Sequence, residues 1–359
     1  MSTATSREDQ ELLRLFSHSR KWLGSYMIYR EPRILPRQYF TTLPSRSFTN
    51  SLRKLPPELL FLIYSYLDLE SITKLRTVDR WMKVMIDAFP AYQNLLQHAP
   101  MAVQALADTH LLASFSISAL YDALRSEACV GCSDFGPFLL LPLGKRCCFN
   151  CLQHNLLLRV ITVPAAQKCF GLNKSAVDSL PKLHSLPGTY GPESRLVKGR
   201  KQLVSVWEAQ ERGIELHGGR DEMETTVLTN SLKELAAFTR KTEKWSSRSA
   251  NSLASRRPVR PKTPKEILEA PNDPFRLLAS VPFPFLRRGG TVEHGMSCVG
   301  CQNLKANHAL ANKTLDTRNL TFERELEQND IKSYTERGIL QHFSQCRGTK
   351  NVRSLKRKR

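Results

Sequence analysis

Residues 52–86 read LRKLPPELLFLIYSYLDLESITKLRTVDRWMKVMI, and this stretch decides the fold of the N-terminal third of the chain. Pro56 and Pro57 are favoured in the first turn of a helix, because the N–H groups that they lack would be unpaired there in any case. Glu58 follows them and meets the positive end of the helix dipole. We therefore expect a helix to begin at this pair of prolines.

Apolar residues recur at helical spacing after that start. A first helix carries them at i, i+4, i+7 and i+8, at Leu59, Ile63, Tyr66 and Leu67. Asp68 is a good N-cap for a second helix that contains Ile72 and Leu75. The apolar pattern then continues at Val78, Met82, Met85 and Ile86. Taken alone, this periodicity is that of an ordinary helical hairpin whose apolar stripes form its core.

The same residues resemble the F-box family. The family pattern opens with Leu-Pro-x-Glu-Leu, which is present here as Leu55, Pro56, Glu58 and Leu59. It closes with Leu-Arg-x-x-x-Arg-Trp, which is present as Leu75, Arg76, Arg80 and Trp81. Asp79 departs from the pattern, since the family often has Cys or Ser at this position. The resemblance implies a three-helix F-box at residues 51–90 that binds the Skp adaptor and, through it, the cullin of a ubiquitin ligase.

The resemblance also implies which side chains contact the adaptor. They are Leu55, Pro56, Leu59, Ile63, Leu67, Leu75, Val78 and Trp81. A unit of this size buries little apolar surface by itself. Part of its stripe is therefore expected to pack against a further helix or two at Met101–Leu124, and part to await the partner.

Four cysteines in the middle of the chain have the spacing of a zinc site. Cys129-Val-Gly-Cys132 and Cys148-Phe-Asn-Cys151 form two C-x2-C pairs separated by fifteen residues. Two tight turns of this kind bring four thiolates around one tetrahedral zinc ion. Gly131 is expected to supply a positive φ to its turn. Cys147 is an alternative ligand, and buried free thiols or a redox pair are the other interpretations.

A second set lies near the C-terminus. Cys298-Val-Gly-Cys301 is followed, after 40 residues, by His342-Phe-Ser-Gln-Cys346. The four-residue spacing places His342 and Cys346 on one face of a helix, where they can complete a second zinc site. The arrangement is similar to that of fungal F-box proteins with paired cysteine motifs. The residues that carry this similarity are Tyr334, Arg337, Gly338, Leu340, His342, Phe343 and Cys346. Cys169 has no partner at a suitable spacing and is expected to be a buried thiol.

Catalytic signatures such as a phosphate loop, G-x-G-x-x-G, H-E-x-x-H or G-x-S-x-G are absent from the sequence. Two zinc ions with four protein ligands each would also lack the open position that metal catalysis uses. We therefore expect a receptor without catalytic activity of its own, holding an unidentified protein substrate near the ligase subunits that carry out the transfer.

The chain is strongly basic, with 53 Lys and Arg against 33 Asp and Glu and a formal charge of +20. This charge favours acidic or phosphorylated protein segments as substrates. It also supports a rival class, a nucleic-acid-binding zinc protein, through the basic runs 240–265 and 350–359. Trp245 is the one aromatic residue in these runs, which are therefore interpreted first as solvated segments. A third alternative is an F-box scaffold without a role in ubiquitin transfer.

The basic tail resembles a nuclear import signal, so the expected location is the nucleus, the cytoplasm or both. No apolar run approaches the length of a membrane span, and a membrane partner is not expected.

The expected fold is mainly α, an F-box followed by a small irregular helical domain with two cysteine clusters. The expected divisions are a disordered basic arm at 1–50 with one helix near Gln10–Ser17, the F-box at 51–90, a helical segment with the first cluster at 91–180, a helical and basic linker region at 181–297, a Cys/His unit at 298–347 and a basic tail at 348–359.

Overall fold

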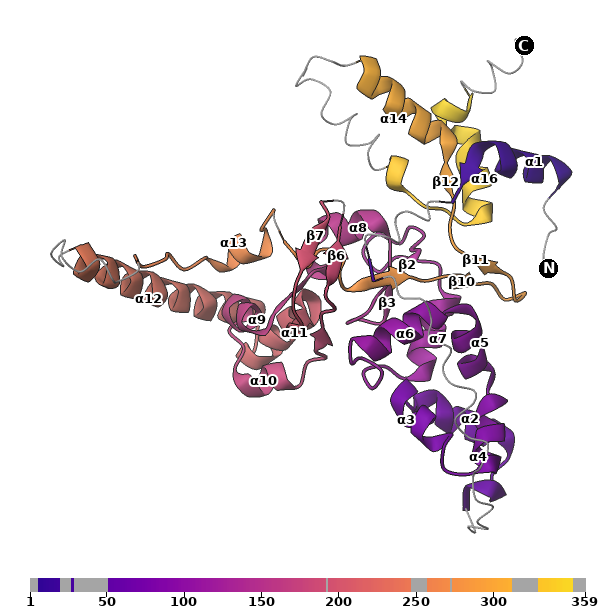
Figure 1. Ribbon diagram of the computed structural model, residues 1–359, viewed down its shortest axis with the longest axis horizontal. Helices are drawn as coiled ribbons and strands as arrows, with labels where there is room; N and C mark the ends of the chain where they lie inside the picture. The colour runs from indigo at the N-terminus through magenta and orange to yellow at the C-terminus, as the bar shows by residue number, and fades with distance from the viewer. Residues whose placement is uncertain are drawn as a thin grey trace.

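The computed structural model describes residues 6–19, 27–28, 51–191, 193–246, 257–271, 273–311 and 329–350. The chain is mainly helical, as predicted, and it also contains small two- and three-stranded sheets (Figure 1). Among the helices of these residues, none combines the length and the apolar character needed to cross a membrane.

Six helices and a 3₁₀ turn form the N-terminal half of the body. They are η2 (Ser51–Lys54), α2 (Pro57–Tyr66), α3 (Leu69–Leu75), α4 (Arg80–Asp87), α5 (Pro90–His98), α6 (Pro100–Asp108) and α7 (Ile117–Arg125). The helix expected at the proline pair does begin at Pro57. The carboxylate of Asp68 caps α3 by accepting from the Ser71 N–H at 2.7 Å, which confirms the predicted N-cap. An ion pair between Arg76 and Asp87 then ties α3 to the end of α4.

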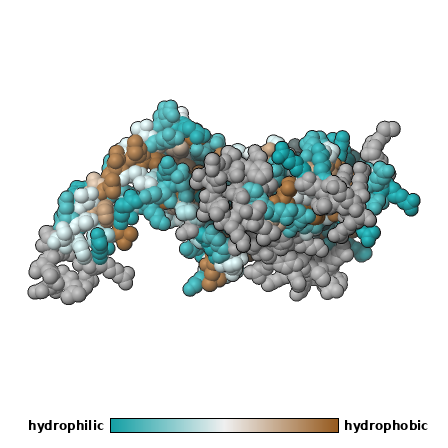
Figure 2. All heavy atoms as spheres, turned by 90° about the horizontal axis from the view of Figure 1, so that it is seen from above, coloured by the Kyte–Doolittle hydropathy of each residue, from teal (hydrophilic) through white to brown (hydrophobic). Residues whose placement is uncertain are grey.

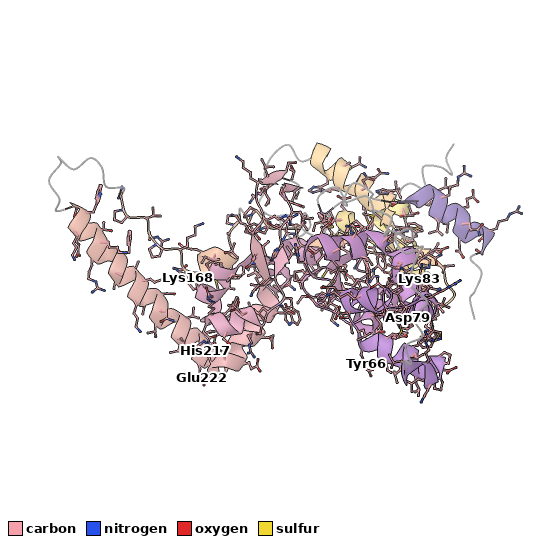
Figure 3. All side chains as sticks on the ribbon, turned by 60° about the horizontal axis from the view of Figure 1, so that its bottom comes forward. Tyr66, Asp79, Lys83, Lys168, His217 and Glu222 are labelled. Atoms are coloured by element: carbon pink, nitrogen blue, oxygen red, sulfur yellow. The ribbon has the colours of Figure 1, made fainter. Side chains whose placement is uncertain are left out.

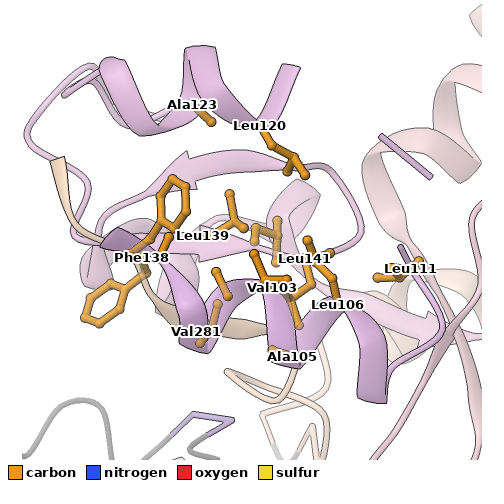
Figure 4. Close-up of a cluster of buried hydrophobic side chains, with 14 of the residues drawn as sticks. Val103, Ala105, Leu106, Leu111, Leu120, Ala123, Phe138, Leu139, Leu141 and Val281 are labelled. Atoms are coloured by element: carbon orange, nitrogen blue, oxygen red, sulfur yellow. The ribbon is translucent and has the colours of Figure 1, made fainter. Parts of the chain in front are cut away.

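The main core lies between α6, α7 and a three-stranded antiparallel sheet. The sheet has the order β3-β2-β9, with β2 at Phe138–Leu140, β3 at Lys145–Cys147 and β9 at Ser280–Pro282. Figure 4 shows α7 and α6 on opposite faces of β2, so that both faces of this strand are covered and all three of its residues are buried. Because both faces of this strand are buried, its sequence is continuously apolar rather than alternating.

The strand β9 changes one predicted division of the chain. Residues 181–297 were expected to be a helical and basic linker region, yet Leu139 on β2 lies opposite Val281 on β9. The residues around β9 belong to the main core: Phe275, Leu277, Leu278, Ala279, Val281, Phe283 and Leu286 are buried there. The strand β9 has only three residues and ends in proline, so it has neither the length nor the alternation from which a strand is predicted. The sequence pattern therefore did not indicate it.

A second core joins a small sheet to a group of helices. The sheet has the order β4-β8-β5, from β4 (Val160–Thr162), β8 (Gln202–Ser205) and β5 (Leu183–His184), and the hairpin β6 (Gly188–Tyr190) and β7 (Arg195–Val197) precedes β8 in the chain. The helices are α9 (Val163–Phe170), α10 (Lys174–Asp178), α11 (Val206–His217), α12 (Arg220–Ser246) and α13 (Pro264–Leu268). Both α11 and α12 lie within the region 181–297, which was expected to be partly helical. Between the two cores lie α8 (Phe149–His154) and η3 (Leu156–Leu158).

The C-terminal unit contains β12 (Ser297–Cys298), α14 (Val299–Ala311) and α16 (Glu336–Gln345), and the hairpin β10 (Phe285–Leu286) and β11 (Val292–Glu293) leads into it. Residues 7–18 belong to this unit as well. They form α1 (Arg7–Phe16) and β1 (Ser17–His18), which lie against α16 and β12 (Figure 1). The helix expected near Gln10–Ser17 is present as α1, and it is packed rather than part of a disordered arm, because Leu12, Leu13 and Phe16 place an apolar face on the unit. Residues 29–50 and the tail 351–359 lie outside the described residues.

Candidate functional site

The first cysteine cluster brings together all four predicted thiols. The Sγ atoms of Cys129, Cys132, Cys148 and Cys151 lie within 4.8 Å of one another, and those of Cys132 and Cys148 are 3.6 Å apart. Three of these cysteines are buried, and Cys132 is exposed. The group can hold a metal ion.

Local backbone geometry produces this cluster. A turn after Cys129 folds back on itself, since the Ser133 N–H donates to the Cys129 carbonyl at 2.9 Å. The left-handed residue of the turn is Ser133, with φ of 62°, and not Gly131 as predicted. Gly131 instead leaves room for a ligand, because a Cβ atom at this position would lie only 3.0 Å from the Cys151 Sγ. The other pair lies at the start of α8, where Cys148 is the N-cap and accepts from the Cys151 N–H at 3.4 Å.

The thiols of this cluster perturb one another strongly. Hydrogen bonds from Cys147 and Cys148 lower the pKa of Cys129. The hydrogen bond with Cys129, followed by burial, raises the pKa of Cys148. Burial, followed by the charge on Cys129, raises the pKa of Cys151 to about 12. Four thiols this close cannot all ionise without a cation, and a bound metal would supply that charge. Cys147, the alternative ligand, is fully buried beside Cys129 but is not among the four clustered donors.

The second cluster brings together residues from the two ends of the C-terminal unit. The donor atoms of Cys298, Cys301, His342 and Cys346 also lie within 4.8 Å of one another. The Cys346 Sγ is 3.7 Å from both the Cys298 and the Cys301 Sγ atoms. Cys298 ends β12, Cys301 lies in the first turn of α14, and the other two donors lie at the end of α16. The group can hold a second metal ion.

A tyrosine fixes the orientation of the histidine in this cluster. The Nε2 atom of His342 faces the thiols, at 3.3 Å from the Cys301 Sγ, and the Nδ1 atom lies 3.3 Å from the Tyr334 hydroxyl. The Tyr334 ring stacks on the imidazole with a centroid distance of 4.7 Å. A metal on Nε2 would leave the imidazole proton on Nδ1, which would then donate to the tyrosine oxygen. Hydrogen bonds to the Cys298 and Cys346 thiolates raise the pKa of His342 to about 9.

Both donor sets are closed. Each supplies four soft or borderline ligands, four sulfurs in one case and three sulfurs with an imidazole nitrogen in the other. Such sets favour structural metal ions, because four protein ligands leave no position for a substrate or a reacting water. Cys169, which like Cys147 lies outside the clusters, is buried as predicted, and burial raises its pKa to about 12.

The helix α2 is apolar on all sides and buries only one of them. Leu60 and Tyr64 point into the main core, where the Tyr64 ring packs edge-on against Phe89. The opposite side is in solvent: Leu59, Leu62, Ile63 and Tyr66 are 48%, 55%, 42% and 75% exposed. Their spacing at i, i+3, i+4 and i+7 makes a continuous stripe, which we call the α2 face.

The predicted adaptor-binding residues divide into two groups. Pro56, Leu59, Ile63 and Val78 are exposed, whereas Leu55, Leu67, Leu75 and Trp81 are half-buried and pack against the core. The guanidinium of Arg53 also covers the Trp81 ring at 5.5 Å. The prediction missed Leu62 and left Tyr66 out of the contact set, although the i, i+3, i+7 spacing from Leu59 could have identified both.

Comparisons of the chain with family models, with curated proteins and with solved structures give no match. The functional assignment therefore rests on two features of the molecule, the pair of four-donor clusters and the exposed α2 face. The clusters suggest metal-stabilised folding, and the face suggests a partner. Neither feature includes an open catalytic position.

Proposed function

We propose that the chain is the substrate-recruiting F-box subunit of a Skp–cullin–F-box ubiquitin ligase, and that the α2 face binds the Skp adaptor. The observation that carries this proposal is the exposed stripe of Leu59, Leu62, Ile63 and Tyr66. A helix with apolar residues all round is normally buried all round. An exposed apolar patch of this kind on a soluble domain is typical of a site for protein association. Tyr66 lies at the outer edge of the α2–α4 region in Figure 3.

The one departure from the family pattern is consistent with this role. Asp79 stands where the family often has Cys or Ser, and here it is the N-cap of α4. Its carboxylate accepts from the Met82 N–H at 2.7 Å and forms an ion pair with Arg53 at 3.4 Å. Asp and Ser are comparably good N-caps, so the start of the third F-box helix is preserved by a different side chain.

The two clusters are proposed to hold one zinc ion each. Tetrahedral sites with four thiolates, or with three thiolates and an imidazole, are typical of structural zinc. Zinc at Cys129, Cys132, Cys148 and Cys151 would fix the turn before β2 and the start of α8. Zinc at Cys298, Cys301, His342 and Cys346 would join α14 to α16. The metal would then supply folding free energy that the small sheets and short helices of these regions lack.

The body outside the F-box would hold the substrate. The formal charge of +20 favours a protein segment that is acidic or phosphorylated. The chain would accelerate ubiquitin transfer by proximity and would carry out no chemical step itself. A scaffold that binds the adaptor without cullin, and a zinc protein that binds nucleic acid, are the alternatives that the experiment must separate.

The test replaces two exposed residues of the α2 face in the full chain, as L59K and I63K together. Because both side chains lie on the solvent side of α2 and outside the core, the fold should be unchanged and the thermal stability nearly so, while binding to the Skp adaptor should fall at least about 100-fold. The matched control is L196K, which changes an exposed leucine on β7. Unaltered capture of the adaptor by the double variant would contradict the proposal. The presence of cullin in the purified complex would favour a ligase receptor, and its absence a scaffold. Tight binding of nucleic acid with no capture of the adaptor would favour a nucleic-acid-binding zinc protein.

A further inference from the structure

The helix α12 has a second exposed apolar stripe. It is 27 residues long and extends away from the body as an arm (Figure 1). At the foot of the arm, Met223 and Val227 are buried against α9 and α11, and nearer the midpoint Glu234 forms an ion pair with Lys168 on α9. Leu228, Leu232 and Leu235 are 62%, 58% and 42% exposed on a side of the helix turned away from those anchors. Figure 2 shows apolar atoms along this arm.

Adaptor binding does not account for this stripe. Glu222, at the foot of α12, and Tyr66, at the α2 face, are well separated in Figure 3. Leucines at i, i+4 and i+7 form one line on a helix, and such a line is the usual mark of a helix partner. The partner can be identified from the order of residues along the line.

The line reads almost the same in both directions. Continued by one step at each end, it consists of Thr225, Leu228, Leu232, Leu235 and Thr239, and all five residues are exposed. Leu232 lies next to the midpoint of α12, with one leucine and one threonine on each side of it. When two copies of such a helix pack antiparallel, Leu232 meets Leu232, Leu228 meets Leu235, and Thr225 meets Thr239.

We propose that this line, the α12 stripe, is a homodimer interface in which α12 of a second copy of this chain packs antiparallel across Leu232. A two-fold axis through Leu232 would make the contact isologous, with the same stripe on both sides. The side chains beside the line at Thr229 and Ala236 are small, which lets two helix axes approach closely.

The charges along α12 favour the antiparallel orientation. Its first turns contain Asp221, Glu222 and Glu224, with Arg220 as the only cation there, while its last turns contain Arg240, Lys241 and Lys244 with Glu243 as the only anion. Antiparallel packing brings the acidic start of each helix to the basic end of the other, and parallel packing would bring like charges together. Glu222 and Arg240 are both exposed and lie on the same flank of the stripe, so each would face the other across the interface.

The first experiment measures the molar mass of the full chain over a range of concentrations, by sedimentation or light scattering. We expect a concentration-dependent dimer, and the L232E variant should weaken it at least about 100-fold, because two carboxylates would face each other on the axis. The control N230E adds the same charge on the opposite side of α12 and should leave the dimer intact. A chain that is monomeric at all concentrations, or an N230E variant that dissociates as L232E does, would overturn the proposal.

The second experiment tests the register and the orientation. Leu232→Cys should form a disulfide with its own copy under mild oxidation, whereas Leu228→Cys should link only when mixed with Leu235→Cys. Linkage of Leu228→Cys to itself would show parallel packing and overturn the antiparallel interface. The charge variants E222R and R240E should each weaken the dimer, and the two together in one chain should restore it. Failure of that restoration would contradict the pairing of Glu222 with Arg240.

Discussion

Ser17 lies directly opposite Cys298 in the antiparallel pair of β1 and β12, so a residue near the N-terminus pairs with the strand that carries a donor of the second cluster. The helix before it is attached to the same unit, because the Phe16 ring packs edge-on against Phe343 with 6.0 Å between centroids. Phe343 directly follows His342 on α16. The N-terminal helix α1 is therefore held by the same elements that hold the four donors.

This relationship predicts how loss of one donor affects the chain. The purified protein should contain two zinc ions, and Cys346→Ser should remove one of them. The second site would then lose folding free energy on the order of 10 kcal/mol, more than its small core can replace. Residues 298–347 and α1 should become sensitive to trypsin together, with a new cut at Arg14, while adaptor binding is unchanged. Metal analysis and mass spectrometry of the fragments measure both effects.

Cys169→Ser is the control for that prediction. Cys169 is buried in the second core and belongs to neither cluster, so this variant should keep both metal ions and the protected α1. If Cys346→Ser loses one zinc ion but Arg14 remains protected, then α1 is held by its own packing and the coupling is wrong. A single zinc ion in the unmodified protein would remove the second site.

The contact between Tyr334 and His342 predicts a smaller effect. Tyr334→Phe keeps the stacked ring but removes the hydroxyl that lies 3.3 Å from Nδ1. The imidazole would lose the partner that fixes its proton on Nδ1, and zinc affinity at the second site should fall about 10-fold. Competition with a chromophoric chelator measures the affinity. Tyr190→Phe removes a hydroxyl bonded to the Leu186 carbonyl outside both clusters, and its zinc affinities should not change.

The two donor clusters were predictable from the sequence because their geometry is local. A C-x2-C pair closes within one turn, and the His342 and Cys346 spacing is one turn of helix. The helix start at Pro57 and the cap at Asp68 depend on neighbouring residues in the same way. All of these features are present in the structure.

Long-range contacts were not predictable by the same means. Periodicity could not decide which side of α2 faces the core, because the helix is apolar on every side. Periodicity alone favoured Leu59 and Ile63 as core residues, whereas the structure buries Leu60 and Tyr64. The pairing of β2 with β9 joins segments separated by more than 130 residues, and neither strand has an alternating pattern.

The buried guanidinium of Arg146 predicts a large loss of stability. Arg146 is 2% exposed and donates to the carbonyls of Ala123, Gly136, Phe283 and Pro284, which ties α7 to the segment after β9. Burial lowers its pKa to about 9, so the side chain is still protonated at pH 7. Arg146→Met would leave these buried carbonyls unpaired and should lower the free energy of unfolding by about 3–5 kcal/mol.

Urea unfolding of the zinc-loaded chain measures this loss. Arg125→Met is the matched control, because Arg125 on α7 is only partly buried and donates to the single carbonyl of Arg287. It should cost about 1 kcal/mol. Equal losses for the two variants would show that the carbonyls around Arg146 find other partners.

Glu208 in the first turn of α11 predicts a pH dependence of stability. Burial raises its pKa to about 7, and its Oε2 atom has no hydrogen-bond partner among the described residues. The folded-state pKa is therefore above the unfolded value of about 4.5. The folded chain holds this proton more tightly than the unfolded chain does, so the stability that depends on it is fully present below pH 4.5. That stability is lost as the pH rises to about 7.

Glu208→Gln removes this titration and keeps the shape of the side chain. The gain in unfolding free energy of the variant over the unmodified chain should be larger at pH 8 than at pH 6, by about 1 kcal/mol after allowance for solvent near this half-buried group. Both pH values are high enough for zinc to stay bound by thiolates, so the comparison isolates the carboxyl group. Glu211→Gln, at an exposed position of the same helix, should show no such difference. An equal gain for Glu208→Gln at the two pH values would mean that Glu208 is already ionised at pH 6, and that water reaches its Oε2 atom in the folded chain.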